Sequence, residues 1–189
     1  MKMLISVVLD KTYINDLGSL LTVESVVLPR VLIEELRRRE LDAESVVIDL
    51  LLGFLNIDPR VIPEVRLELA AKYLNEGKGL IGKDPVQASE KLYKAAEEAI
   101  KAMAICLNLD VAKSIEGKGR WTVTDLVTAV RATSRIVGKE VRGEWDTAWV
   151  LHVWGFHEAK LSADDVKDRL QDVEDLVKRA EETCKGSHA

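Results

Sequence analysis

Hydrophobic residues recur at intervals of three and four from about residue 60 to residue 185, which is the period of an amphipathic α-helix. The broadest pattern follows Asp84 and Pro85, which suit a helix N-cap and the first helical position. A face this wide and this rich in small residues predicts a central helix that its neighbours approach closely. Its two apolar stripes consist of Ala88, Leu92, Ala95, Ala99, Ala102 and Cys106, and of Tyr93, Ala96, Ile100, Ala104 and Leu107.

Other helices flank the central one. A helix from Pro63 to Leu74 is expected to end at Gly77 and Gly79, because glycine commonly terminates helices. Glycine-rich links are expected at residues 77 to 83, 117 to 119 and 138 to 143.

Two capping boxes, at residues 122 to 125 and 162 to 165, start later helices. The helix after Ser162 has an unbroken apolar stripe of Val166, Leu170, Val173, Val177, Ala180 and Cys184. About five helices result, and the sequence predicts a mainly α fold, an antiparallel up-and-down helical bundle over residues 60 to 185.

Residues 1 to 58 follow a different pattern. A β-branched strand is expected from Thr22 to Leu28, a helix from Pro29 to Leu41, and a second helix to Leu55. This small N-terminal strand-helix-helix extension resembles the ribbon-helix-helix fold, which pairs strands across a dimer and places them in the DNA major groove. The strand carries no arginine or lysine to bind guanine, and glutamates surround the basic run at residues 37 to 39. Dimerisation or packing on the bundle is therefore favoured over DNA binding.

The composition is typical of a globular protein without strong bulk attraction to nucleic acid. Of its 189 residues, 47% are hydrophobic and 31% charged, and the net charge is −5. No apolar run is long enough to span a bilayer and no signal peptide is evident, which favours a cytoplasmic protein with no membrane partner. Abundant Glu, Lys and Arg suggest a thermophilic source. The only cysteines, Cys106 and Cys184, are too few for a disulfide framework and are expected to be small core residues.

The least ordinary segment runs from Trp145 to His157 and holds three of the four tryptophans and two of the three histidines. On an α-helix, Trp145, Trp149, His152 and Phe156 share one face, whereas His157 points elsewhere. The two histidines are therefore not expected to hold one metal ion, and no metal site is predicted.

His152 is either a core histidine or a general acid or base, and His157, beside Glu158, is equally a structural and a functional candidate. No nucleotide-binding loop or hydrolase triad is present, and no cofactor is expected. On the central helix, Tyr93 is expected in the interior, and Glu97 and Glu98 on the surface.

The runs from Asp84 to Ala104 and from Trp145 to Glu158 resemble the archaeal PaREP family, which is similar to the HEPN superfamily (higher eukaryotes and prokaryotes nucleotide-binding). The resemblance covers residues 60 to 185. It implies a helical bundle, commonly a homodimer, associated with nucleotide binding or with ribonuclease toxins. Catalytic members resemble one another in an arginine followed after four to six residues by a histidine. Here nine residues separate Arg142 from His152, and no arginine lies between residues 143 and 156.

We therefore expect a homodimeric HEPN-like protein that is a non-enzymatic nucleotide- or partner-binding module. The expected ligand-binding residues are Trp145, Trp149, His152, Trp154, His157 and Glu158. The alternative is a metal-independent ribonuclease of toxin type acting on RNA, in which His157 or His152 works with Arg142 or Arg135. A second alternative is a DNA-binding regulator that acts through the N-terminal segment.

Overall fold

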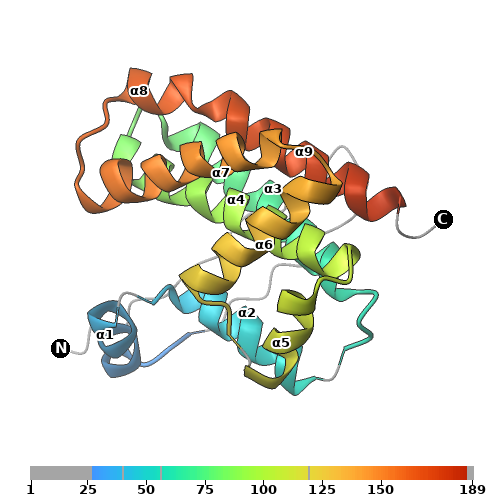
Figure 1. The fold of residues 1–189 in the computed structure, drawn as a ribbon. Coiled ribbons are helices and arrows are strands. Elements are labelled where there is room, and N and C mark those ends of the chain that lie inside the picture. Colours follow the sequence, from blue (N-terminus) through green and yellow to red (C-terminus); the bar gives the residue numbers. More distant parts are fainter. Residues whose placement is uncertain (1–26, 40, 56, 119, 187–189) are drawn as a thin grey trace. The chain divides into compact units, whose positions relative to one another are not determined.

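The computed structural model describes residues 27–39, 41–55, 57–118 and 120–186, although the side chains of residues 116 to 118 are not described. The chain divides into two compact units, residues 1 to 51 and residues 52 to 189. This division falls inside a helix, whereas the predicted domain boundary lies just before residue 60. Figure 1 shows the two units as a largely helical chain.

The first unit contains α1 (Arg30–Arg38) and most of α2 (Ala43–Phe54), so both predicted N-terminal helices are present. Asp42 caps the start of α2, because its carboxylate accepts hydrogen bonds from the backbone N–H and the hydroxyl of Ser45. Glu35 pairs with Arg38 and Arg39, as expected of a solvated helix face. The predicted strand lies outside the described residues up to position 26, and residues 27 and 28 form no strand.

The second unit is built on a hairpin of α3 (Ile62–Leu80) and α4 (Pro85–Cys106). Asp84 caps α4 by accepting a hydrogen bond from the Gln87 backbone N–H at 3.0 Å, as predicted. The predicted end of α3 at Gly77 is wrong, since the helix continues to Leu80. A Cβ on Gly77 would meet Leu92 of α4 at 2.8 Å, so this glycine serves close helix packing instead of chain termination.

Helices α5 (Asp110–Lys118), α6 (Val123–Ile136) and α7 (Glu140–Val150) follow α4. The capping box between Thr122 and Asp125 starts α6, as predicted. The expected link at residues 138 to 143 is shorter than predicted, because α7 already begins at Glu140 and includes Gly143.

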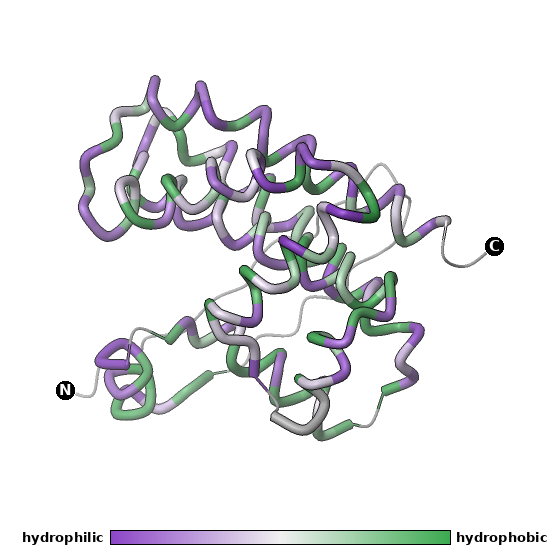
Figure 2. The backbone as a smooth tube through the Cα atoms, in the orientation of Figure 1, coloured by the Kyte–Doolittle hydropathy of each residue, from purple (hydrophilic) through white to green (hydrophobic). Residues whose placement is uncertain are grey.

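The chain then forms the π-helical turn η1 (Leu151–His157), α8 (Ala163–Asp168) and α9 (Leu170–Gly186). The predicted box between Ser162 and Asp165 caps α8. The apolar stripe of this region is in the core, with Leu170 partly buried and the others buried: Val166, Val173, Val177, Ala180 and Cys184. Hydrophobic and hydrophilic positions alternate along the helices (Figure 2).

Helix α4 is the centre of this unit, since it contacts α3, α9, η1, α6 and α7. Six of its alanines are fully buried, and their small size lets these helices come close: Ala88, Ala95, Ala96, Ala99, Ala102 and Ala104. The predicted central helix and mainly α fold are confirmed. Within the described residues, every helix is too short or too polar to cross a membrane.

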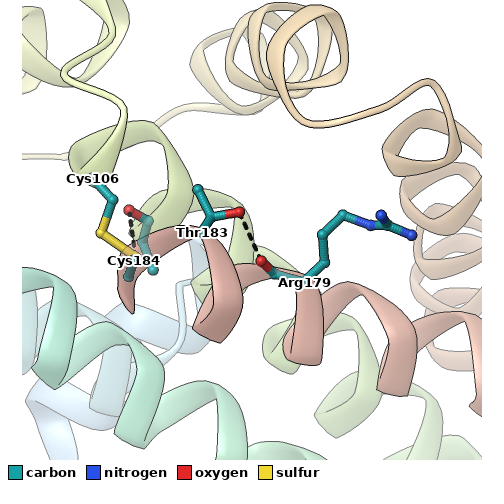
Figure 3. Close-up of a disulfide and its surroundings, with 5 residues drawn as sticks. Cys106, Arg179, Thr183 and Cys184 are labelled. Carbon is teal, nitrogen blue, oxygen red and sulfur yellow. Dashed lines mark hydrogen bonds between the residues drawn. A yellow bond between two sulfur atoms is a disulfide. The ribbon is translucent and has the colours of Figure 1, made fainter. Parts of the chain in front are cut away.

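A disulfide joins Cys106 at the end of α4 to Cys184 near the end of α9 (Figure 3). The prediction that both cysteines are merely small core residues is therefore wrong. The Cα atoms lie 5.3 Å apart, within the ordinary range for a disulfide, although 78 positions separate them in sequence. Spacing alone gave no sign of the pairing, because it arises from two helices running together in the bundle.

Candidate functional site: a histidine pair and an arginine-lined cavity

The π-helical turn brings His152 and His157 together. Five residues of an α-helix would separate the two side chains by about 140° around the axis. In η1 the Glu158 backbone N–H donates to the Val153 carbonyl at 2.9 Å, the i→i−5 bond of a π-helix. The Nε2 atoms of His152 and His157 consequently lie 3.1 Å apart. The prediction that they point apart is wrong because it assumed an α-helix.

Glu90 of α4 extends this pair into a chain of three side chains. Its Oε2 lies 3.0 Å from Nδ1 of His152, and both groups are mostly shielded from solvent. A carboxylate in this position favours the tautomer in which His152 Nδ1 carries the proton and donates it, leaving Nε2 as the acceptor that faces His157. His157 is exposed, so this row of three side chains reaches the surface at His157.

Aromatic rings fix the position of His152. Its ring stacks on Tyr93 with 4.0 Å between centroids, and it also contacts the rings of Trp149 and Phe156. Trp145 is buried against Tyr93. The predicted stripe of Trp145, Trp149, His152 and Phe156 is therefore present.

Two of the predicted ligand-binding residues lie apart from this stripe. Trp154 is 53% exposed and makes no ring contact with the described side chains. Glu158 is also exposed. That all six residues bind one ligand stays a prediction.

Gly155 sets the distance between η1 and α4. A Cβ at this position would lie 2.3 Å from Oγ and 2.5 Å from Cβ of Ser89. Only glycine permits this approach, and Ser89 is the residue before Glu90. The same contact that packs η1 on α4 therefore holds His152 beside its carboxylate.

A buried ionic cluster continues along α4. Arg66 Nη1 donates to Glu98 Oε2 at 2.9 Å, and Lys101 Nζ lies 2.7 Å from Glu98 Oε1 and 2.6 Å from Glu97 Oε1. The prediction that Glu98 is a surface residue is wrong: its side chain is 3% exposed. Burial alone would raise the pKa of Glu98, but the charges and hydrogen bonds of Lys101 and Arg66 outweigh it and lower the pKa.

Tyr93 links the ionic cluster to the histidines. It stacks on His152, and Glu97 lies close enough to act on the pKa of its hydroxyl. Burial, followed by the negative charges of Glu97 and Glu90, raises the pKa of Tyr93 far above its ordinary value. Tyr93 is thus a neutral hydrogen-bond donor, and its predicted interior position is confirmed.

Neither candidate arginine reaches the histidines within this chain. Arg142 Nε donates to Oγ of Ser134 at 2.9 Å, and its helical position is about 15 Å along the axis from His152. Arg135 lies on α6 and faces the start of α5, which follows the end of α4. That end is about 24 Å along α4 from Glu90. Arg135 and the two histidines therefore belong to separate sites, and Arg142 belongs to neither.

The second site is a cavity of about 280 Å³ between α5 and α6. Arg131 and Arg135, one helical turn apart on α6, line it, and neither forms an ion pair with a carboxylate in the described part of the chain. The remaining lining residues are Leu109, Asp110, Val111, Thr128 and Ala132. The hollow thus combines apolar side chains with two cationic groups, one carboxylate and one hydroxyl.

Comparison with known proteins identifies the family. The archaeal PaREP1/PaREP8 family matches residues 65 to 177. The chain belongs to this family. Both sites of this PaREP1/PaREP8 chain lie within the matched segment. No curated protein matches the chain.

Two solved structures resemble this PaREP1/PaREP8 chain. A crystal structure of a Sulfolobus solfataricus protein has 41% identity and a TM-score of 0.56, and the match covers 60% of this chain and 94% of that one. A solution structure of the same structural-genomics target has 40% identity and a TM-score of 0.54, with 60% and 89% covered.

Sequence reasoning did not identify Glu90 or the ionic partners of Glu98 as parts of a site, and it considered Arg131 only as a partner of the histidines. The only available signal for Glu90 was its position three residues before Tyr93, which places both on one face of α4. Which helix faces them depends on tertiary packing. The cavity likewise combines residues of two helices and left no local pattern.

Proposed function

We propose that this PaREP1/PaREP8 chain is a HEPN-like, non-enzymatic module that binds a mononucleotide in the cavity between α5 and α6. The observation that carries the proposal is the arginine pair, Arg131 and Arg135, which faces the cavity without a carboxylate partner among the described residues. Two like charges one helical turn apart disfavour the folded helix by a few tenths of a kcal/mol, about 0.2 to 0.5. A bound anion would remove this repulsion.

Phosphate is the anion that suits this pair. A guanidinium is planar and donates two parallel hydrogen bonds to phosphate oxygens, so two guanidiniums can hold one phosphate from two directions. Arginines four residues apart lie on the same helix face, which allows Arg131 and Arg135 to converge on one group.

The rest of the cavity suits the remainder of a nucleotide. Leu109, Val111 and Ala132 offer apolar surface to a base, and Asp110 can accept hydrogen bonds from ribose hydroxyls. A volume of about 280 Å³ is near the lower limit for small-ligand sites, which favours a mononucleotide over a dinucleotide.

The ribonuclease alternative is less well supported, because it needs an arginine beside a histidine. The separation of Arg135 and Arg142 from His152 argues against that pairing within one chain. Incubation of the protein with mixed RNA in EDTA tests it. RNA cleavage that disappears in His157→Ala would favour the ribonuclease function over nucleotide binding.

Two further expectations need separate measurements. Sedimentation of the full chain tests the expected homodimer. Titration with duplex DNA at several salt concentrations tests DNA binding by the first unit.

Calorimetric titration of the full chain with AMP, ATP and inorganic phosphate tests the proposed function. We expect saturable AMP binding that weakens about 10- to 150-fold for each arginine removed, since a charged hydrogen bond contributes about 1.5 to 3 kcal/mol. The variants are Arg131→Ala and Arg135→Ala, with Arg37→Ala of α1 as the matched control. Unchanged AMP affinity in the double variant, or no binding of any of the three probes, would refute the proposal.

A further inference from the structure

We propose that His152 and His157 form a transition-metal site for an ion of the Zn²⁺ class, bound by the Nε2 atom of each ring. The proposal concerns the η1 turn and is independent of the nucleotide cavity. An α-helical reading of the sequence excluded such a site, and the π-helical turn removes the objection.

The distance between the two nitrogens fits a shared ion. Zn²⁺ binds histidine nitrogen at about 2.0 to 2.1 Å, so two Nε2 atoms 3.1 Å apart would subtend about 98° at the metal. This angle falls between the 90° of an octahedral site and the roughly 109° of a tetrahedral one. The distance between the two nitrogens therefore needs no change.

The ring orientation also favours convergence on a third atom. If the two Nε2 atoms pointed directly at each other along a linear hydrogen bond, the ring centroids would lie about 5.4 Å apart. If both pointed at a metal, the separation would be about 4.8 Å. The observed separation is 4.5 Å, with the rings at 79° to each other. The centroids are therefore closer than a linear hydrogen bond allows, so the two Nε2 atoms do not point straight at each other.

Glu90 supplies the partner that metal-binding histidines usually have. A ligating imidazole commonly donates its other N–H to a carboxylate, which orients the ring and makes the ligating nitrogen more basic. Nδ1 of His152 lies 3.0 Å from Oε2 of Glu90, which leaves Nε2 available to the ion. Tyr93 stacks on the same ring and limits its rotation.

The other coordination positions would be open to solvent. The described residues contain no group of three potential metal ligands, so the site consists of two histidines and water. Exposure of His157 gives an ion direct access. Imidazole ligands suit Zn²⁺, Cu²⁺ and Ni²⁺, and not Mg²⁺ or Ca²⁺, which prefer oxygen.

Titration of the full, metal-free chain with ZnCl₂, followed by calorimetry, tests the site. We expect one Zn²⁺ per histidine pair and no heat of binding with MgCl₂. His157→Ala, a change at an exposed position, should abolish the binding of this Zn²⁺ ion. Glu90→Gln should weaken it by about 10- to 100-fold, the usual effect of losing such an outer partner.

His188→Ala is the matched control, because it removes the third histidine of the chain and should leave the affinity unchanged. A circular dichroism melt without metal checks that each variant folds. The proposal is overturned if wild-type protein does not bind Zn²⁺, or if His157→Ala binds it as tightly as wild type. It is also overturned if His188→Ala alone abolishes binding.

Discussion

Breaking the Cys106–Cys184 disulfide should strongly destabilise the helical bundle. The bond closes a loop with a sequence separation of 78. Closing a loop of this length reduces the entropy of the unfolded chain, which raises the free energy of the unfolded state by about 4.5 kcal/mol at 25 °C. This is a large part of the 5 to 15 kcal/mol that is typical of a folded domain.

Guanidinium unfolding of the wild type and of Cys106→Ala/Cys184→Ala measures the effect. All four tryptophans lie between the two cysteines, so their fluorescence reports on the unit that the disulfide closes. With a slope of about 4 to 5 kcal/mol/M, the midpoint should fall by roughly 1 M. A reducing agent should produce a similar loss in the wild type and none in the double variant. Equal midpoints for oxidised and reduced wild type would refute the reasoning, as would two free thiols in the untreated protein.

Three further predictions concern α4 and its contacts. Gly155→Ala should lower the free energy of unfolding by about 1 to 3 kcal/mol, because its Cβ would overlap Ser89. Adding Ser89→Gly to this variant should restore part of the loss in a thermal melt, and no restoration would contradict the packing account. Glu98→Ala should cost about 3 to 5 kcal/mol in denaturant unfolding, because it leaves the buried cations Arg66 and Lys101 without their shared carboxylate; a loss under 1 kcal/mol would be inconsistent with the cluster. Folding lowers the pKa of Glu98, so the ionised carboxylate stabilises the folded chain above its unfolded pKa of about 4.5. This stabilisation is lost as the pH falls below that value. The free energy of unfolding should therefore depend less steeply on pH in this range in Glu98→Gln than in the wild type.

The sequence predicts those parts of the fold that depend on local signals. The start of α4 at Asp84 and Pro85 and the two capping boxes all correspond to hydrogen bonds between neighbouring residues. The aromatic stripe that includes His152 was likewise predicted from α-helical spacing. Local chemistry is sufficient for features of this kind.

Features that depend on tertiary packing were missed or predicted wrongly. Gly77 continues α3 because Leu92 packs against it, and Glu98 is buried because two cations from different positions surround it. The π-helical turn at His152 has no reliable sequence signal, and it changes which side chains share a face. The histidine pair and its carboxylate therefore became recognisable only once η1 was seen on α4.

A nuclear magnetic resonance titration of the ¹⁵N-labelled chain with AMP tests the proposed function most directly. The account predicts that amide shifts concentrate at residues 109 to 111 and 128 to 135, around the arginine-lined cavity. Shifts confined to residues 145 to 158, or no shifts at saturating AMP, would contradict it.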